Sequence, residues 1–183
     1  ILANKEENVK EQVEALMTDF KVVVTNVENV EDNYYLLKTL GKLFNKEEKA
    51  QCFNLKIYDV LNEAKINSSI KVAYLIWKNP YMTIGSDTFI DKILGEIGFE
   101  NIFKDRKRYP VIETEDLADA EIIMLSSEPF PFKEKHIEEL KVFYPDKKIM
   151  IVDGEAFSWY GTHIAKCANY FKELIAEVEA IKM

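Results

Sequence analysis

Large aromatic side chains are concentrated in three loop-like stretches of the chain, at residues 77–85, 127–132 and 154–161. Rings of this size normally lie in a core, so their concentration in loops points to a broad, flat ligand that would cover them. The alternative is that the rings fill the end of a domain and pack under one another. The rings are Trp77, Tyr81, Phe130, Phe132, Phe157, Trp159 and Tyr160.

Polar residues in the same loops could bind the edge of such a ligand. Amide, hydroxyl and carboxylate groups fix the orientation of a ligand inside a largely apolar pocket. The predicted ligand-binding residues are therefore Trp77, Asn79, Tyr81, Ser127, Glu128, Pro129, Phe130, Glu155, Phe157, Trp159 and Tyr160.

A catalytic interpretation rests on three carboxylates. Asp153 and Glu155 lie at the end of a predicted strand, and Glu128 could join them across a cleft as acid and base groups. The loops offer no nucleophile beside a base and no glycine pattern that wraps a phosphate, so binding without chemistry is preferred and an α/β enzyme is the alternative. His136 and His163 have no Cys or carboxylate at metal-ligand spacing, so neither a metal site nor a catalytic cofactor is predicted.

The aromatic loops follow three short runs rich in Ile and Val, at residues 71–76, 121–126 and 148–153. Continuous apolar runs are typical of strands that are buried on both faces of a parallel sheet. Helices are expected after each loop: residues 87–97 with Ser86 as cap, a segment after Lys133, and residues 162 to the end. Alternating strands and helices predict an α/β lobe whose ligands bind at the carboxyl ends of the strands.

The first part of the chain predicts a second, smaller unit. Residues 1–3 and 21–25 read as strands around a helix at 11–17, and long helices follow at 31–44 and 47–64. The second long helix could bridge two lobes. The expected division is an end of an N-terminal lobe at 1–30, a helical connector at 31–67 and a C-terminal α/β lobe at 68–183, with the rest of the first lobe lying upstream.

Composition restricts the class of partner. The 183-residue chain has a net charge of -8, which argues against a nucleic-acid partner because phosphate binding needs clustered Lys and Arg. Its apolar runs are too short to cross a bilayer. Cys52 and Cys167 fall on the apolar stripes of predicted helices, so both are expected to be buried thiols.

Four stretches carry a resemblance to a known class, at residues 74–83, 98–103, 125–132 and 153–161. They resemble cobalamin-binding and iron-chelate-binding proteins of the helical-backbone class, which are the substrate-binding components of ABC importers. Residues 1–8 are also similar to a segment near the end of the first lobe of these proteins. The resemblance implies two Rossmann-like lobes of three αβα layers, joined by one long rigid helix, with the ligand held between them.

The resemblance also implies a ligand, a partner and a location. Cobalamin is the first candidate ligand, followed by haem and ferric siderophores, and the protein would be an extracytoplasmic monomer that delivers the ligand to an ABC permease. Members of the class dock on the permease through an acidic residue on each lobe. The candidates here are Glu128 and Glu134 on the second lobe, and Glu7 or Glu11 on the first. A third hypothesis is an adaptor domain whose aromatic rim is a protein interface.

Overall fold

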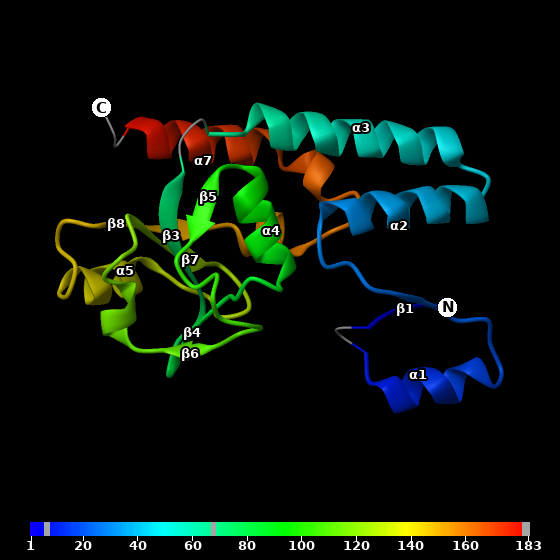
Figure 1. Cartoon of the computed structure of the whole chain (residues 1–183), viewed down its shortest axis with the longest axis horizontal. Coiled ribbons are helices and arrows are strands. Elements are labelled where there is room, and N and C mark those ends of the chain that lie inside the picture. Colours follow the sequence, from blue (N-terminus) through cyan, green and yellow to red (C-terminus); the bar gives the residue numbers. More distant parts are fainter. Residues whose placement is uncertain (6–7, 67–68, 181–183) are drawn as a thin grey trace.

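The computed structural model describes residues 1–5, 8–66 and 69–180. The chain forms a small N-terminal unit, two long helices and a larger α/β unit (Figure 1). Asn67, the last residue of the predicted helical connector, lies outside the described residues, and so does Glu7.

The N-terminal unit is the predicted βαβ arrangement. Strand β1 (Leu2–Asn4) pairs in parallel with β2 (Val23–Thr25), and α1 (Lys10–Met17) connects them. The β1–β2 sheet has two strands, and a two-stranded sheet is marginal in water. The unit therefore depends on whatever packs against it.

Two antiparallel helices connect the units. Helix α2 (Val30–Leu43) begins at Asn29, whose side chain accepts a hydrogen bond of 2.8 Å from the backbone N–H of Asp32. A turn at Asn45, in the left-handed region with φ of 53°, leads into α3 (Glu47–Glu63). Helix α3 packs against α2 and also contacts α7 (Ala168–Ala180), the last helix of the larger unit (Figure 1). Among the described residues, no helix is both long enough and apolar enough to cross a membrane.

The larger unit is built on a six-stranded sheet with the path β6-β4-β3-β7-β8 and with β5 also paired to β3. Three of its strands, β3 (Ile70–Trp77), β7 (Ile122–Ser126) and β8 (Lys148–Val152), are the predicted ones, and they are parallel. All five residues of β7 are buried, which explains its continuous apolar pattern. The sequence did not predict the short strands β4 (Tyr81–Thr83), β5 (Phe99–Asn101) and β6 (Val111–Ile112), of which β4 and β6 are antiparallel to their neighbours.

Helices cover both faces of this sheet, which confirms the predicted three-layer α/β fold. One face packs against α3, α4 (Phe89–Glu96), α6 (Gly154–Ser158) and α7 (Ala168–Ala180) in a core that includes Tyr74 and Met124. The other face packs against α5 (Glu134–Lys141) and the 3-10 turn η1 (Thr114–Leu117), around Leu75 and Leu125.

Three local predictions were wrong. Helix α4 is capped by Thr88, whose hydroxyl accepts from the N–H of Asp91, and not by Ser86. The last helix does not begin at residue 162, because a 3-10 turn, η2 (Ile164–Lys166), precedes α7. Cys52 is exposed, whereas Cys167 is buried as expected, and burial raises the pKa of its thiol to about 11.

The N-terminal unit should be the least protected part of the chain. All eight residues of α1 are described, and none of them is buried. We expect the backbone amides of β1 and β2 to exchange with deuterium at least about 100-fold faster than those of β3 and β7, because little buried apolar surface holds this unit closed. Hydrogen exchange followed by mass spectrometry measures this ratio, and equal protection of both sheets would contradict it.

Candidate functional site, a cleft between the two units

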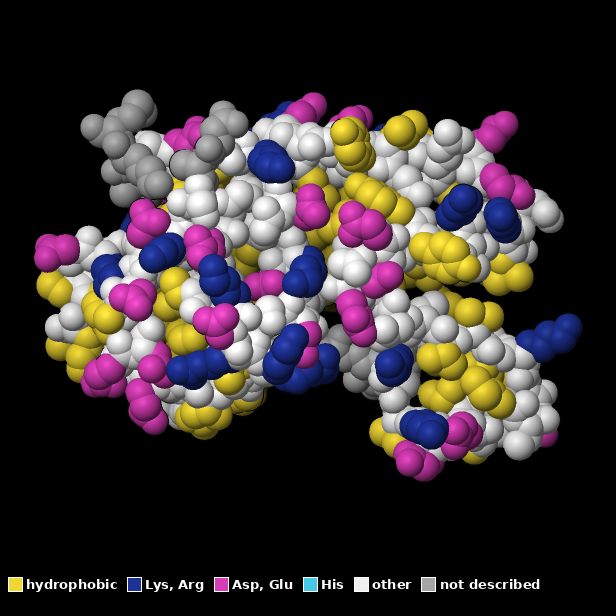
Figure 2. Space-filling view, in the orientation of Figure 1, with side chains coloured by type: hydrophobic (Ala, Val, Ile, Leu, Met, Phe, Trp, Pro, Cys, Tyr) yellow, Lys and Arg dark blue, Asp and Glu magenta, His cyan; other side chains and the backbone are white. Residues whose placement is uncertain are grey.

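The carboxyl ends of the parallel strands open onto a cleft that faces the N-terminal unit. Two cavities of about 320 and 340 Å³ lie there and share the lining residues Ile90, Tyr109 and Ser158. In the space-filling view, a hollow separates the α/β unit from the N-terminal unit (Figure 2). The cleft is therefore at the edge of the sheet where the sequence predicted ligand binding.

Both units contribute walls to the first cavity. Asn4 and Val27 come from the N-terminal side, and Phe89, Arg108 and Tyr160 come from the α/β unit. Five of its eight lining residues are apolar or aromatic, and the polar ones are Asn4, Arg108 and Ser158.

The second cavity lies against the end of strand β3. Its walls are mainly apolar and include Ile76, Trp77, Met82 and Pro129. Trp77 is 40% exposed, so a large face of its indole is open. Of the predicted ligand-binding residues, Trp77, Pro129 and Tyr160 therefore line the cleft.

The loop before β6 supplies two lining residues that the sequence analysis missed, Arg108 and Tyr109. Backbone hydrogen bonds hold this loop, since the N–H of Gly85 donates to Arg108 over 2.7 Å and that of Thr83 donates to Pro110 over 3.0 Å. The Asp87 carboxylate accepts from the Arg108 N–H at 2.6 Å, and this bond lowers the pKa of Asp87. The sequence offered one signal for these two residues, because Tyr109 stands next to Pro110 at the end of a basic segment.

Phe130 lies beneath Trp77 and not in the cleft lining. Its ring meets Trp77 edge-on at 5.6 Å between centroids and Phe132 at 4.8 Å. Phe132 is buried, and both phenylalanines pack against the buried His136. These rings support Trp77 from inside the fold.

Phe157 is a core residue, which corrects its prediction as a ligand contact. Its side chain is 0% exposed and packs edge-on against Tyr74 at 5.3 Å and Phe171 at 5.5 Å. The cause is local, because residues 154–158 form α6 and turn Ala156 and Phe157 inward. For Phe132 and Phe157, the alternative that rings fill the end of the domain is the right one.

The remaining predicted residues of the first loop lie around the β3–β4 hairpin. Asn79 is exposed and adopts the left-handed region, with φ of 63°. Tyr81 is half-buried against the second core, and burial raises the pKa of its hydroxyl. Neither side chain lines the two cleft cavities.

The polar residues that follow β7 and β8 have partners within the protein. The Ser127 hydroxyl accepts from the N–H of Gly154 at 2.9 Å, and the Asp153 carboxylate caps α6 by accepting from the N–H of Glu155 at 3.0 Å. Glu128 Oε1 accepts from Ser158 Oγ at 3.0 Å and from the indole Nε1 of Trp159 at 3.1 Å. Two of the three carboxylates of the catalytic hypothesis, Asp153 and Glu128, therefore hold local structure.

Segment 158–161 connects the two units beside the cleft. Asn4 of β1 donates a side-chain hydrogen bond to the hydroxyl of Tyr160. Asn33 of α2, which is 0% exposed, accepts from the Gly161 N–H at 2.6 Å and donates to the Gly161 carbonyl at 3.3 Å. Within residues 1–5, 8–66 and 69–180, no group of three or more His, Cys, Asp and Glu side chains is placed to hold a metal ion.

No protein-family model and no curated protein matches the chain, but solved structures do. A possible iron-binding (periplasmic solute-binding) protein from Staphylococcus epidermidis is 22% identical, with a TM-score of 0.74 over 97% of this chain and 75% of that one. The periplasmic vitamin B12 binding protein of Vibrio cholerae is 13% identical, with a TM-score of 0.78 over 98% of this chain and 74% of that one. The periplasmic heme binding protein of Vibrio cholerae is 18% identical, with a TM-score of 0.76 over 95% of this chain and 75% of that one.

This chain shares the α/β fold of these periplasmic binding proteins. The class to which the loops bore a resemblance is therefore confirmed at the level of fold. At these identities the likeness concerns the fold alone. The chain spans about three quarters of the length of each of these three structures.

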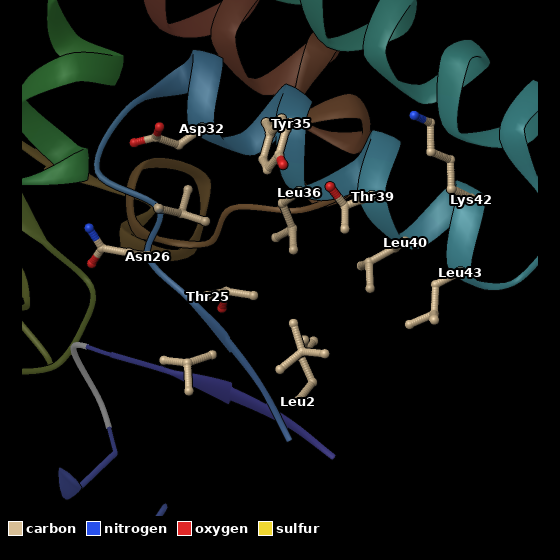
Figure 3. A pocket seen from close by; sticks show the side chains of 13 residues that line it. Leu2, Thr25, Asn26, Asp32, Tyr35, Leu36, Thr39, Leu40, Lys42 and Leu43 are labelled. Atoms are coloured by element: carbon tan, nitrogen blue, oxygen red, sulfur yellow. The ribbon is translucent and has the colours of Figure 1, made fainter. Parts of the chain in front are cut away.

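A larger cavity, of about 510 Å³, lies between the β1–β2 sheet and α2 and shares the lining residue Val27 with the first cleft cavity. Leu2, Leu36, Leu40 and Leu43 point into it (Figure 3). Hydrophobic side chains gather over the same region in the space-filling view (Figure 2). We call this cavity the α2 groove; most of its exposed lining is apolar, and its polar lining residues are Thr25, Asn26, Asp32, Thr39 and Lys42.

Proposed function

We propose that this protein is the substrate-binding component of an ABC import system and captures a large metal chelate in the interlobe cleft. The observation that carries the proposal is the cleft lining, in which Trp77, Met82, Ile90, Tyr109 and Tyr160 present apolar and aromatic faces between two units of a binding-protein fold. Such faces bury a broad ligand at little cost in side-chain entropy.

Cobalamin remains the first candidate ligand, because a corrinoid presents the broad face that these rings fit. A haem or a ferric siderophore is the second candidate, and Arg108 favours it. Arg108 is one of the lining residues of the cleft, and guanidinium groups pair well with the carboxylates that haem and many siderophores carry. A protein that binds such ligands in an extracytoplasmic space would then release them to a membrane permease.

The four candidate residues for docking on the permease can be reduced to two. Glu134, the first residue of α5, and Glu11 in the first turn of α1 are both exposed, whereas Glu7 lies outside the described residues. Because Glu128 Oε1 binds two groups of segment 158–161, we propose Glu134 on the α/β unit and Glu11 on the N-terminal unit as the permease contacts.

We propose further that residues 1–30 are the end of a second α/β lobe, whose other strands and helices pack on the α2 groove. Two features support this assignment: the sheet there has two strands, and Leu2, Val24 and Leu43 are exposed around the groove. A quarter of the length of each similar structure also has no counterpart in this chain. Further strands would bury that apolar surface.

Tryptophan fluorescence tests the proposed function directly, because the chain has two tryptophans: Trp77 lines the cleft, and Trp159 follows the lining residue Ser158. Cyanocobalamin, hemin and a ferric siderophore absorb near the indole emission. We expect one of them to quench that emission saturably, with a dissociation constant in the micromolar range or below. N-acetyltryptophanamide at matched absorbance controls for the inner-filter effect, and Trp77→Phe should remove a large part of the signal. Quenching that never saturates with any of the chelates would refute capture and leave the enzyme or adaptor hypotheses.

A further inference from the structure

Segment 158–161 runs along the rim of the cleft, and one carboxylate binds its first two residues. Ser158 lines both cleft cavities and Tyr160 lines one of them. Trp159, between them, is 51% exposed, and its ring lies tilted by 55° to the ring of His163, with 5.4 Å between centroids. A half-exposed indole at the end of a five-residue helix has many accessible orientations unless a specific bond restricts it.

Glu128 provides that restriction. Its Oε1 accepts from Ser158 Oγ at 3.0 Å and from Trp159 Nε1 at 3.1 Å, so a single atom joins both side chains. An indole has one N–H donor, and a bond from it to a carboxylate is stronger than a bond to a neutral acceptor. The indole therefore has a hydrogen bond to Glu128 and a ring contact with His163.

The position of Glu128 is itself set by the core. Ser126 Oγ donates to the Glu128 carbonyl at 2.5 Å and accepts from the buried Tyr74 hydroxyl at 3.2 Å. The Glu128 side chain lies against the backbone of Gly154, where a Cβ would come within 2.5 Å of Glu128 Cγ. The absence of a side chain at residue 154 therefore leaves room for the carboxylate to reach Ser158 and Trp159.

We propose that Glu128 is a positioning residue that holds Trp159 over the mouth of the cleft, where the indole covers the bound chelate. The inference rests on the proposed function, because it assigns Trp159 to the cover of that same ligand. It replaces the sequence-based roles of Glu128 as a ligand contact and as a permease contact. Ser158, which lines both cavities, donates to the same Glu128 oxygen. The position of its side chain therefore depends on Glu128 as well.

Single-tryptophan proteins test the arrangement without a ligand. In a Trp77→Phe background, the emission reports Trp159 alone, and we compare Glu128→Ala, Glu128→Gln and the exposed Glu138→Ala on α5 as a charge-matched control. Glu128→Ala should lower the anisotropy of Trp159 and raise its quenching by acrylamide about twofold or more, because the indole loses its acceptor. Glu128→Gln keeps a carbonyl acceptor and should stay near the parent, as should Glu138→Ala. Unchanged anisotropy and quenching in Glu128→Ala would overturn the proposal.

Chelate affinity supplies the second measurement, made by calorimetry with cyanocobalamin and hemin so that it does not depend on tryptophan. Glu128→Ala should weaken binding about tenfold and Glu128→Gln about threefold or less. Adding Glu128→Ala to Trp159→Phe should cause little further loss of chelate affinity, because both changes remove the same Glu128–Trp159 hydrogen bond. Independent, additive losses would overturn the proposal. If neither chelate binds the parent protein, the proposed function fails, and the ligand-free fluorescence still decides whether Glu128 positions Trp159.

Discussion

Phe157→Ala should lower the free energy of unfolding by about 3–5 kcal/mol, which is the usual cost of removing a fully buried phenylalanine. The ring is 0% exposed and lies among Tyr74, Tyr170 and Phe171, so alanine would leave a cavity that these aromatic neighbours cannot easily fill. Urea denaturation followed by circular dichroism measures the change.

Trp159→Ala is the matched control, two residues along the chain. Its ring is 51% exposed, so its loss should cost about 1 kcal/mol or less, while chelate binding weakens. Comparing the two variants distinguishes an aromatic residue that stabilises the fold from one that borders the cleft. A Phe157→Ala protein as stable as the parent, with reduced chelate affinity, would restore the interpretation of Phe157 as a ligand contact.

Much of the fold could be predicted from local pattern. Strands β3, β7 and β8 are buried on both faces, so their apolar runs are continuous and readable, and the helices between them carry clear periodicity. Strands β4, β5 and β6 have two or three residues each. They form because β4 and β5 pair with β3, and β6 pairs with β4. Such pairing leaves no periodic hydrophobic pattern within the short strands themselves.

The cleft lining was only partly predictable, for two physical reasons. Aromatic residues after parallel strands correctly pointed to Trp77 and Tyr160, because the carboxyl ends of such strands meet at one edge. Helix α6 has five residues, too short to show a helical period, so the inward turn of Phe157 was invisible in the sequence. Arg108 and Tyr109 reach the cleft through backbone bonds between residues far apart in sequence, such as Gly85 and Arg108.

Asn33→Ala should be the second large loss of stability, at about 2–4 kcal/mol. The Asn33 amide is 0% exposed and satisfies both the N–H and the carbonyl of Gly161, at 2.6 and 3.3 Å. Removing it leaves two backbone groups without their partner, and each such group costs about 1–3 kcal/mol when water cannot reach it. Gly161 is partly exposed, so the lower half of the range is expected.

The effect of Asn33→Ala should also extend to the cleft, because Gly161 follows Tyr160 and Trp159 on the rim. In the Trp77→Phe background, the emission of Trp159 should become more accessible to acrylamide even below the unfolding transition. Lys38→Ala, at an exposed position of the same helix, controls for helix propensity and should change stability by about 0.5 kcal/mol or less. If Asn33→Ala were no more destabilising than Lys38→Ala, the bonds to Gly161 would not hold α2 to the α/β unit.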